Sequence, residues 1–359
     1  MKYRHIDGQA SFCVENQEVA ITTTVQSGCT MPYFKLDGRE ICPYWTAPWW
    51  KDGAYLDGNN ILSVLRGNFI CVARKEDNNN PEHGWCCASP WEAAEAVSQA
   101  DEARLELRFQ EPYGGTIRKT LRAVAGQKAV YETNLLSGFA GDYSISNHPC
   151  VRLASKAENG YFAFSEPDSL CTPRFFLETP EGGGYMLLER DEAIADYHSV
   201  RSIYGDTLDL AYHPAKPGTF ELLGAFHRQQ FVYAAYLNRE EGYLYYQIKS
   251  TRDFPYIMLW MFSGGRHYAP WNGTQSPTLG IEDCADYPAF LKNPGQYNTF
   301  VTLRPEQSYR FRQIYGVAAL PEGMTKIESV QFETGGAAFL GNDGKRVFAP
   351  FDWSFLKDG

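Results

Sequence analysis

The stretch Arg104-Leu105-Glu106-Leu107-Arg108-Phe109 alternates charged and apolar side chains, residue by residue. A repeat of two is the period of a β-strand that turns one face to a core and the other to water. Residues 129–135 and 231–237 are β-rich runs of similar length, whereas 243–248 and 256–262 are more continuously apolar, as in strands buried on both faces. The chain is therefore predicted to consist mainly of strands.

Turn signals separate these runs, and many short strands at a spacing of roughly 8–12 residues favour a sandwich or a barrel. The best helix candidate is 90–100, where Ala and Glu are good helix formers and Ser89 is able to cap. That segment runs directly into the alternation at Leu105, so we predict mostly strand there. No linker, charge block or internal repeat divides the 359 residues, which predicts one all-β domain over 1–359.

Composition excludes several classes of partner. The formal net charge is −10 and no basic run is longer than Arg74-Lys75, which argues against nucleic acid. No apolar segment follows the first basic residues, and the apolar run 256–262 is too short to span a bilayer, so neither a secretory signal nor a membrane partner is expected. Nine cysteines without a CxxC pair fit reduced thiols, which predicts a cytoplasmic protein.

Three separated motifs carry the side chains that suit proton transfer: His83-Gly84-Trp85, Asn147-His148-Pro149 and Gly280-Ile281-Glu282. Imidazole and carboxylate groups exchange protons with neutral polar molecules near pH 7. We expect each motif at a turn or a strand end, because loops on a rigid β scaffold commonly carry active-site residues. Several tryptophans lie between and around the motifs, and flat apolar faces beside proton-transfer groups suggest a sugar site.

Each motif taken alone also has a structural interpretation. His83 fits a histidine of a surface loop, and His148 fits a turn histidine bonded to the backbone. Glu282 fits a carboxylate at a strand end, although small and apolar neighbours favour a desolvated group with a raised pKa. The segment 44–50, with its Pro48 and three tryptophans, fits a loop over a pocket or a hydrophobic lid.

The ordered set of motifs resembles the galactose mutarotase-like superfamily, the aldose 1-epimerase group. That group has a His-Gly motif, then an Asn-His-Pro-type motif, then a Gly-(Leu/Ile)-Glu motif near the C-terminus. Here the spacings are 65 residues (148 − 83) and 134 residues (282 − 148). Residues 65–69, 263–266 and 270–273 also resemble segments of epimerase-like proteins, so the likeness spans nearly the whole chain.

The resemblance implies a β-supersandwich with its site on the concave face of one large sheet. It implies that the protein interconverts the α and β anomers of a free sugar. Glu282 would be the general base that takes the proton of the anomeric hydroxyl, and His148 the general acid that protonates the ring oxygen. His83 would hold the substrate near that oxygen. No cofactor and no metal is expected.

Two features depart from the family pattern. The aromatic residue that often follows the Asn-His-Pro-type motif is replaced by Cys150-Val151-Arg152. The family's substrate-binding Asp has no match, since Asp206 and Asp209 lack the surrounding pattern.

Other side chains are therefore candidates for binding the substrate. Arg66, Arg266 and His267 suit contacts to hydroxyls or to an anion, which gives the hypothesis of an acidic or modified sugar. Trp49 and Trp271 are candidates for stacking on the sugar or for lining its pocket.

Three alternatives remain open. A metal site would use His83 with Cys86 and Cys87, but the paired ligand spacing is missing. A non-catalytic carbohydrate-binding or regulatory protein on the same fold is distinguished by whether Glu282 and His148 meet at one site. A sugar-cleaving enzyme needs two positioned carboxylates, and only Glu282 stands out. Nothing in the sequence specifies the number of subunits.

Overall fold

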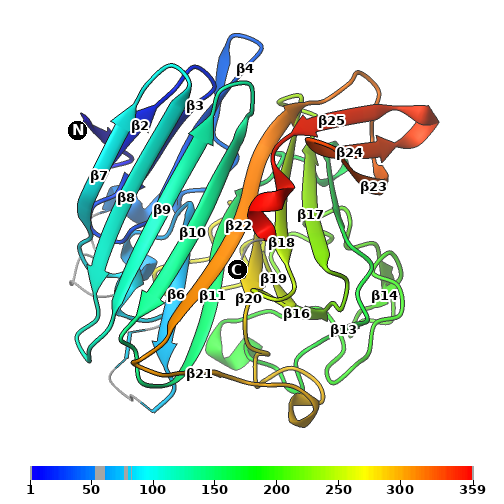
Figure 1. Ribbon diagram of the computed structural model, residues 1–359. Helices are drawn as coiled ribbons and strands as arrows, with labels where there is room; N and C mark the ends of the chain where they lie inside the picture. The colour runs from blue at the N-terminus through cyan, green and yellow to red at the C-terminus, as the bar shows by residue number, and fades with distance from the viewer. Residues whose placement is uncertain (1, 53–60, 77–79, 82, 358–359) are drawn as a thin grey trace.

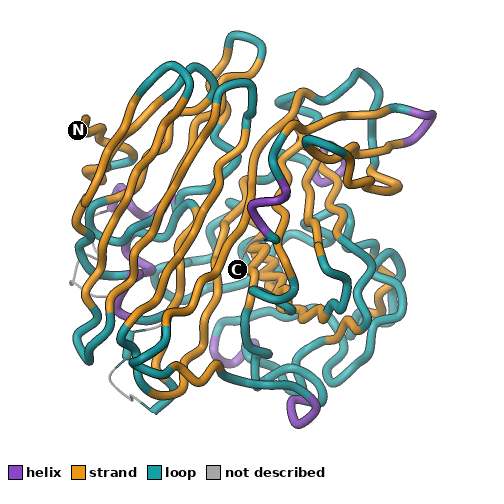
Figure 2. Tube along the Cα trace, in the orientation of Figure 1, coloured by secondary structure: helices purple, strands orange, loops and turns teal. Residues whose placement is uncertain are grey.

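The computed structural model describes residues 2–52, 61–76, 80–81 and 83–357, and two large antiparallel sheets dominate it (Figures 1 and 2). The 12-stranded sheet contains, in spatial order, β1 (Lys2–Ile6), β2 (Gln9–Glu15), β3 (Val19–Thr24), β4 (Thr30–Leu36), β6 (Asn68–Arg74), β11 (Gly141–Arg152), β20 (Thr278–Cys284), β19 (Tyr256–Phe262), β16 (Phe220–Phe226) and β13 (Ser169–Cys171), with β5 (Arg39–Ile41) beside β4 and β21 (Val301–Leu303) beside β11.

The 8-stranded sheet lies against it and forms the second layer (Figure 1). Its strands are, in spatial order, β12 (Gly160–Phe164), β17 (Phe231–Asn238), β18 (Tyr243–Ser250), β22 (Ser308–Ala319), β10 (Ala129–Ser137), β9 (Thr116–Val124), β8 (Glu102–Gln110) and β7 (Glu92–Ser98). This two-layer arrangement confirms the predicted all-β sandwich. The single-domain assignment stays a prediction.

Two small sheets and several 3₁₀ turns complete the described part of the chain. The small sheets are β14 (Val200–Arg201) with β15 (Thr207–Leu208), and β23 (Ile327–Glu333) with β24 (Gly336–Gly341) and β25 (Arg346–Pro350). The 3₁₀ turns are η1 (Pro48–Asp52), η2 (Ile61–Ser63), η3 (Trp85–Cys87), η4 (Ala157–Asn159), η5 (Pro180–Gly182), η6 (Pro294–Gln296), η7 (Asn342–Gly344) and η8 (Trp353–Leu356).

The alternation at 104–109 forms a strand with one buried and one exposed face, as its period of two predicts. It forms most of β8, where Leu105 and Leu107 are fully buried in the main core and Arg108 is exposed. The expected runs 129–135 and 231–237 lie in β10 and β17, and the doubtful segment 90–100 contains β7 rather than a helix. Antiparallel pairing with β8 thus outweighs the helix propensity of Ala and Glu there.

A layer of polar side chains is buried between the two sheets. The Glu132 carboxylate on β10 accepts hydrogen bonds from Asn68 (3.1 Å) and Asn134 (2.9 Å), and the Lys119 ammonium lies 3.7 Å away. Asn134 also donates to Asn147 of β11 at 3.3 Å. Because unpaired polar groups are costly in such an interior, these contacts hold β6 and β11 in one register against β10.

The outer face of the 8-stranded sheet is covered by the C-terminal sheet. Tyr246 on β18 packs against Phe339 of β24 and Phe351, with ring centroids 5.6 and 5.5 Å apart. This contact creates a second hydrophobic cluster, which explains why β18 is buried on both faces.

Two further features bear on the sequence-based expectations. All nine cysteines are free of disulfide bonds, and eight of them are buried. In the part of the chain that the structure describes, no helix has the length and apolar character needed to cross a bilayer.

The neighbours Leu107 and Arg108 provide a matched test of the fold. Leu107→Ala should lower the free energy of unfolding by about 2–5 kcal/mol, because it removes packed core atoms and leaves a cavity. Arg108→Ala on the exposed side of the same strand should change it by less than about 0.5 kcal/mol. Denaturant unfolding followed by circular dichroism measures both. Similar losses for the two variants would contradict the assigned inner and outer faces of β8.

Candidate active site

The candidate site is built by the register of two central strands, β11 and β20. Asn147 pairs with Asp283, so the next residues, His148 and Glu282, face each other across the strands. Asn147 and Asp283 point between the sheets, and Asp283 there lies 3.0 Å from Lys249. Since side chains alternate along a strand, His148 and Glu282 point to the other face of the 12-stranded sheet.

The same row continues onto the flanking strands. β6 places Phe69 beside His148, and β19 places Met258 beside Glu282. The Phe69 ring stacks on the His148 imidazole with centroids 4.7 Å apart and planes 16° apart. Four adjacent strands therefore present one row of side chains, and the apolar ends of that row fix the orientation of the two polar groups between them.

His148 and Glu282 are in direct contact. Nε2 of His148 lies 3.2 Å from Oε1 of Glu282, and the two side chains are only 6% and 3% exposed. Two of the three predicted motifs thus converge on one point. They lie inside strands, however, and the expectation that they would sit at turns or strand ends is wrong for both.

His83 reaches the same point from a loop. The backbone N–H of Val72 on β6 donates to the His83 carbonyl at 3.2 Å, which ties the loop to the sheet. Gly84 follows with φ at 91°, and a Cβ there would overlap the Val72 carbonyl, so the close approach needs glycine. The half-buried His83 ring lies 5.3 Å from that of His148.

Tryptophan rings gather around the pair. Trp260 of β19 lies 5.6 Å from His148, and Trp45 and Trp271 lie 6.5 and 5.7 Å from Trp260. Trp49, on η1, packs 4.7 Å from Trp271. All four rings are buried, and they form one aromatic cluster that reaches His148 through Trp260.

The small size of Gly280 makes room for one of these rings. A Cβ at this position would lie 2.9 Å from the Cβ of Trp260 and 3.5 Å from the Glu282 carboxylate. Gly280 therefore lets Trp260 lie close to the sheet beside the pair. This is the physical reason for the glycine in the Gly-Ile-Glu motif of this chain.

Burial determines the protonation of His148. Desolvation, followed by the nearby His83, lowers the pKa of His148 well below 6.5, so the imidazole is neutral at pH 7. Burial, together with the charge of Glu282, raises the pKa of the Cys150 thiol well above 9. The protonated Cys150 thiol lies 3.5 Å from Nδ1 of His148, and a hydrogen bond to Nδ1 would leave the imidazole proton on Nε2, facing Glu282.

The remaining predicted substrate-binding residues lie elsewhere. Arg66 is buried, and its guanidinium donates to the backbone carbonyls of Val64, Ile6 and Asp7 at 2.9–3.1 Å. Arg266 lies 2.8 Å from Glu178 and packs over Trp271, 4.9 Å from the ring centroid.

His267 is exposed, with its ring 4.9 Å from Tyr185. Of the three, only Arg266 is connected to the aromatic cluster, through Trp271. The hypothesis of an acidic sugar held by Arg66 and Arg266 therefore gains no support from their contacts.

Sequence reasoning did not single out the apolar neighbours of the pair. Phe69, Met258 and Trp260 all face His148 or Glu282, yet each looks like ordinary core in the sequence. The alternation within 256–262 does place Met258 and Trp260 on one face. Which strand lies beside them depends on the sheet order, and no local pattern encodes it.

The metal alternative would use His83 with Cys86 and Cys87. Cys86 and Cys87, both buried, have their sulfurs 3.9 Å apart, and the Cys87 thiol donates to the carbonyl of His83 at 3.1 Å. Within residues 2–52, 61–76, 80–81 and 83–357, no three His, Cys, Asp or Glu side chains gather in a metal-binding arrangement.

Comparison with known proteins identifies the fold. No protein-family model matches the chain, and no curated protein matches its sequence. Solved structures do match over most of the chain. A galactose mutarotase-like protein from Clostridium acetobutylicum has a TM-score of 0.57 at 13% identity, covering 88% of this chain and 97% of its own.

Two further structures agree. An aldose epimerase homologue from C. elegans has a TM-score of 0.55 at 11% identity, covering 87% of this chain and 100% of its own. A galactose mutarotase related enzyme from Lactobacillus acidophilus has a TM-score of 0.55 at 12% identity, covering 87% and 98%. At such low identity the likeness is one of fold.

The burial of His148 makes the stability of the protein depend on pH. The unfolded chain takes up a proton on this residue near pH 6.5, whereas the folded chain does so only well below that value. Above pH 6.5 His148 is neutral in both states, and the free energy of unfolding does not depend on this proton. Below pH 6.5 the unfolded chain binds the proton and the folded chain does not, so the free energy of unfolding falls as the pH is lowered. Between pH 6.5 and about pH 5, wild type should lose about 1–2 kcal/mol more than His148→Gln.

Denaturant unfolding of both proteins across this range measures the difference. Parallel pH profiles for wild type and His148→Gln would show that the folded and unfolded chains bind this proton equally. A chemical-shift titration of the His148 imidazole provides an independent measurement of its pKa.

Proposed function

We propose that this chain, whose fold is that of the galactose mutarotase-like proteins, interconverts the α and β anomers of a free sugar by acid–base ring opening. The observation that carries the proposal is the contact between His148 and Glu282, 3.2 Å apart on one face of the large sheet. The ring oxygen and the anomeric hydroxyl of a pyranose are bonded to the same carbon. An acid and a base that act on both must therefore lie close together.

The reaction needs one proton removed and one supplied. Glu282 takes the proton of the anomeric hydroxyl, and the electrons of that O–H bond form the aldehyde. The bond between C1 and the ring oxygen breaks, and the ring oxygen receives a proton from His148. Rotation about the C1–C2 bond and the reverse transfers close the ring on the other face. His83, 5.3 Å from His148, is positioned to contact the ring oxygen.

The same geometry disfavours glycoside cleavage. Hydrolases use two carboxyl groups separated by roughly 5 Å or more, to leave room for a sugar carbon or a water molecule. Here the partner of Glu282 is an imidazole in direct contact with it. Exchange of anomers needs no water and no covalent intermediate, which suits a pair that is almost fully buried.

We further propose that the substrate is a neutral sugar and that the protein acts in the cytoplasm. Arg66 is buried and donates to backbone carbonyls, and Arg266 is paired with Glu178, so both guanidinium groups are held by contacts within the protein, which supports a neutral substrate. Free thiols at all nine cysteines suit a reducing compartment.

The second candidate function is non-catalytic carbohydrate binding. The observation in its favour is the aromatic cluster beside the pair, in which Trp260 lies 5.6 Å from His148 and Trp45 and Trp271 pack against Trp260. A binding protein needs those rings for stacking but does not need the acid and the base.

Glu282→Gln separates the two functions. Because the amide cannot accept the anomeric proton, the rate of anomer exchange should fall by about 10²–10⁴. Saturation-transfer NMR on a panel of neutral aldoses and uronic acids measures exchange directly. Glu306→Gln, an exposed substitution outside the site, serves as the control and should exchange at the wild-type rate.

The outcomes of this experiment distinguish catalysis from binding and test the roles proposed for Glu282 and for a neutral substrate. Sugar binding without exchange by wild type would establish the binding function in place of catalysis. Exchange that survives Glu282→Gln in a folded protein would remove Glu282 from the reaction. Faster exchange of uronic acids than of neutral aldoses would overturn the proposal of a neutral substrate.

The pKa of His148 predicts the pH dependence of exchange. Because that pKa lies well below 6.5, the imidazolium that donates the proton becomes scarcer as the pH rises. The enzyme-dependent rate at low substrate, kcat/KM, should therefore increase as the pH is lowered from 8 towards 6, by up to about tenfold per unit. A rate that rises with pH over this range would contradict His148 as the acid.

A further inference from the structure

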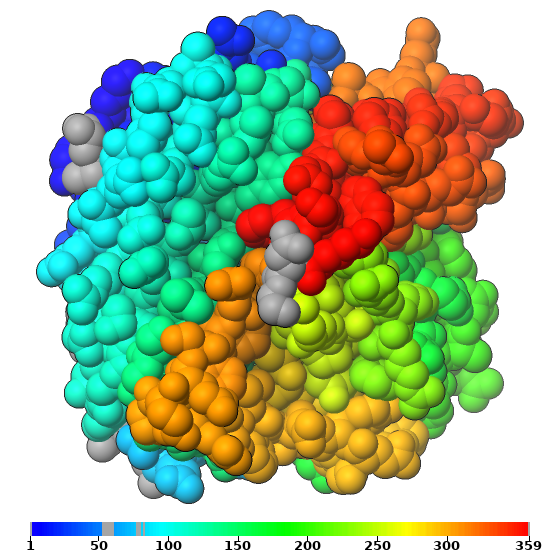
Figure 3. Space-filling view, viewed as in Figure 1, coloured from blue at the N-terminus to red at the C-terminus, as the bar shows by residue number. Residues whose placement is uncertain are grey.

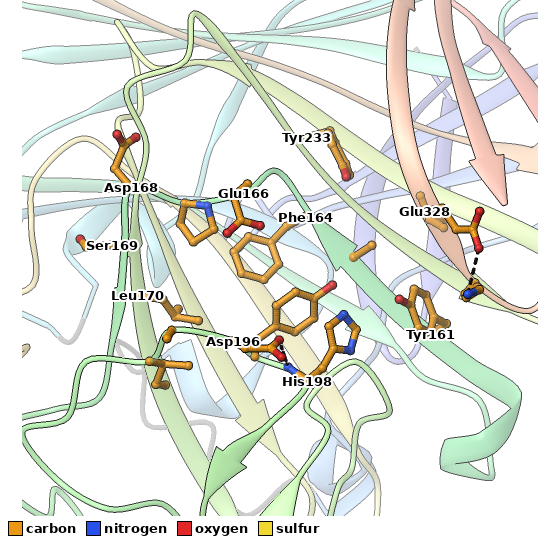
Figure 4. Close-up of a pocket in the computed structure, with 17 residues that line it drawn as sticks. Tyr161, Phe164, Glu166, Asp168, Ser169, Leu170, Asp196, His198, Tyr233 and Glu328 are labelled. Atoms are coloured by element: carbon orange, nitrogen blue, oxygen red, sulfur yellow. Dashed lines mark hydrogen bonds and ion pairs between the residues drawn. The ribbon is translucent and has the colours of Figure 1, made fainter. Parts of the chain in front are cut away.

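A cavity lies away from the His148–Glu282 pair. It has a volume of about 600 Å³ and is bounded by β12, the segments 166–170 and 194–198, β17 and the start of β23 (Figure 4). None of its lining residues belongs to the row of side chains on β6, β11, β20 and β19. Its size is within the range of small-molecule sites.

Aromatic rings form one side of this cavity. The rings of Phe164 and Tyr197 lie 5.1 Å apart, Tyr197 and His198 lie 4.1 Å apart, and Tyr161 stacks on His198 at 6.4 Å. Tyr233 of β17 adds a further ring (Figure 4). The first four rings are in mutual contact and, with Tyr233, come from three separate stretches of chain.

Carboxylates surround these rings. The lining of the cavity contains four carboxylates and one ammonium, so its formal net charge is −3 (1 − 4). The ammonium is that of Lys326, and the carboxylates are those of Glu166, Asp168, Asp196 and Glu328. Lys326 is itself paired with Glu328 at 2.8 Å.

The four carboxylates differ in their hydrogen bonds and ion pairs. Asp168 accepts from the backbone of Arg228 at 2.8 Å, and Asp196 accepts from the backbone of His198 at 2.9 Å. Glu166 lies near Phe164 (Figure 4), and no hydrogen bond or ion pair to its carboxylate is present in the described part of the chain.

The tyrosine hydroxyls of the cavity are neutral. Burial, followed by Tyr212 and Asp209, raises the pKa of Tyr161 to about 12. Burial, followed by Tyr161 and Glu166, raises the pKa of Tyr233 to about 12. Neither hydroxyl therefore adds a charge to the cavity at pH 7.

We propose that this cavity binds a protonated aliphatic amine, with its ammonium group between the Glu166 carboxylate and the tyrosine rings. Ring faces attract cations, and the attraction grows when the site excludes water. The excess of carboxylates selects a cation over a neutral molecule of the same shape. The same ammonium chemistry comes from a free diamine or from a lysine side chain of a peptide.

Calorimetric titration of the whole chain tests the proposal. The probes are putrescine, its uncharged diol analogue, and Nα-acetyl-lysine amide. At neutral pH and low ionic strength, putrescine should bind at least about tenfold more tightly than the diol, and added salt should weaken it. Tighter binding of the lysine derivative than of putrescine identifies a peptide as the source, and the reverse identifies a free amine.

Glu166→Gln and Glu181→Gln form the matched pair of variants. Both residues are exposed, so both variants should fold, and circular dichroism checks this. Glu166→Gln should weaken putrescine by about 3- to 10-fold, whereas Glu181→Gln on η5 should leave its affinity unchanged. Tyr197→Leu should weaken it by a similar factor, because the ring face is lost.

Three results would overturn the proposal: equal binding of diamine and diol, no binding of either amine, or equal effects of Glu166→Gln and Glu181→Gln. Binding of a neutral sugar that is lost in Glu166→Gln would replace the amine with a carbohydrate as the ligand of this cavity. None of these results bears on anomer exchange at His148 and Glu282.

Discussion

The cross-strand pairing of β11 with β20 is the constraint on which the candidate site depends. It sets His148 opposite Glu282, and alternation along each strand sends their neighbours Asn147 and Asp283 into the space between the sheets. A slip of one residue would exchange the two faces and place His148 and Glu282 between the sheets. The site and the interior are therefore specified by the same register.

The buried polar layer between the two sheets fixes the register of β11 with β20. Asn134 of β10 donates a hydrogen bond to Asn147 of β11, and Gln247 of β18 donates to Asp283 of β20 at 3.1 Å. Strands of the second sheet are thus hydrogen-bonded to both β11 and β20 through side chains. Apolar packing alone tolerates many arrangements, whereas a buried hydrogen-bond network is satisfied in few of them. The conformational specificity of the face that carries His148 and Glu282 thus comes from residues on the opposite face of the sheet.

Much of the fold could be predicted from local sequence, because period-two alternation and turn residues are local signals. The strand at 92–98 and the two-faced burial of β18 follow from such patterns. The polar members of the site, His148 and Glu282, could be found because they are unusual among apolar neighbours and occur in a recognisable order. Phe69 and Trp260 could not, because their role depends on which strands are adjacent. Arg66 was misleading for the opposite reason, since a conspicuous charge in the sequence is used to tie backbone carbonyls together.

The nine free cysteines have a practical consequence. Eight of the thiols are shielded from solvent, and five of these eight lie on strands of the 12-stranded sheet, from Cys13 on β2 to Cys284 on β20. An alkylating reagent can reach them only when the surrounding strands separate, so the order in which they are labelled would report which parts of this sheet open first. The chain thus carries its own set of probes for local unfolding.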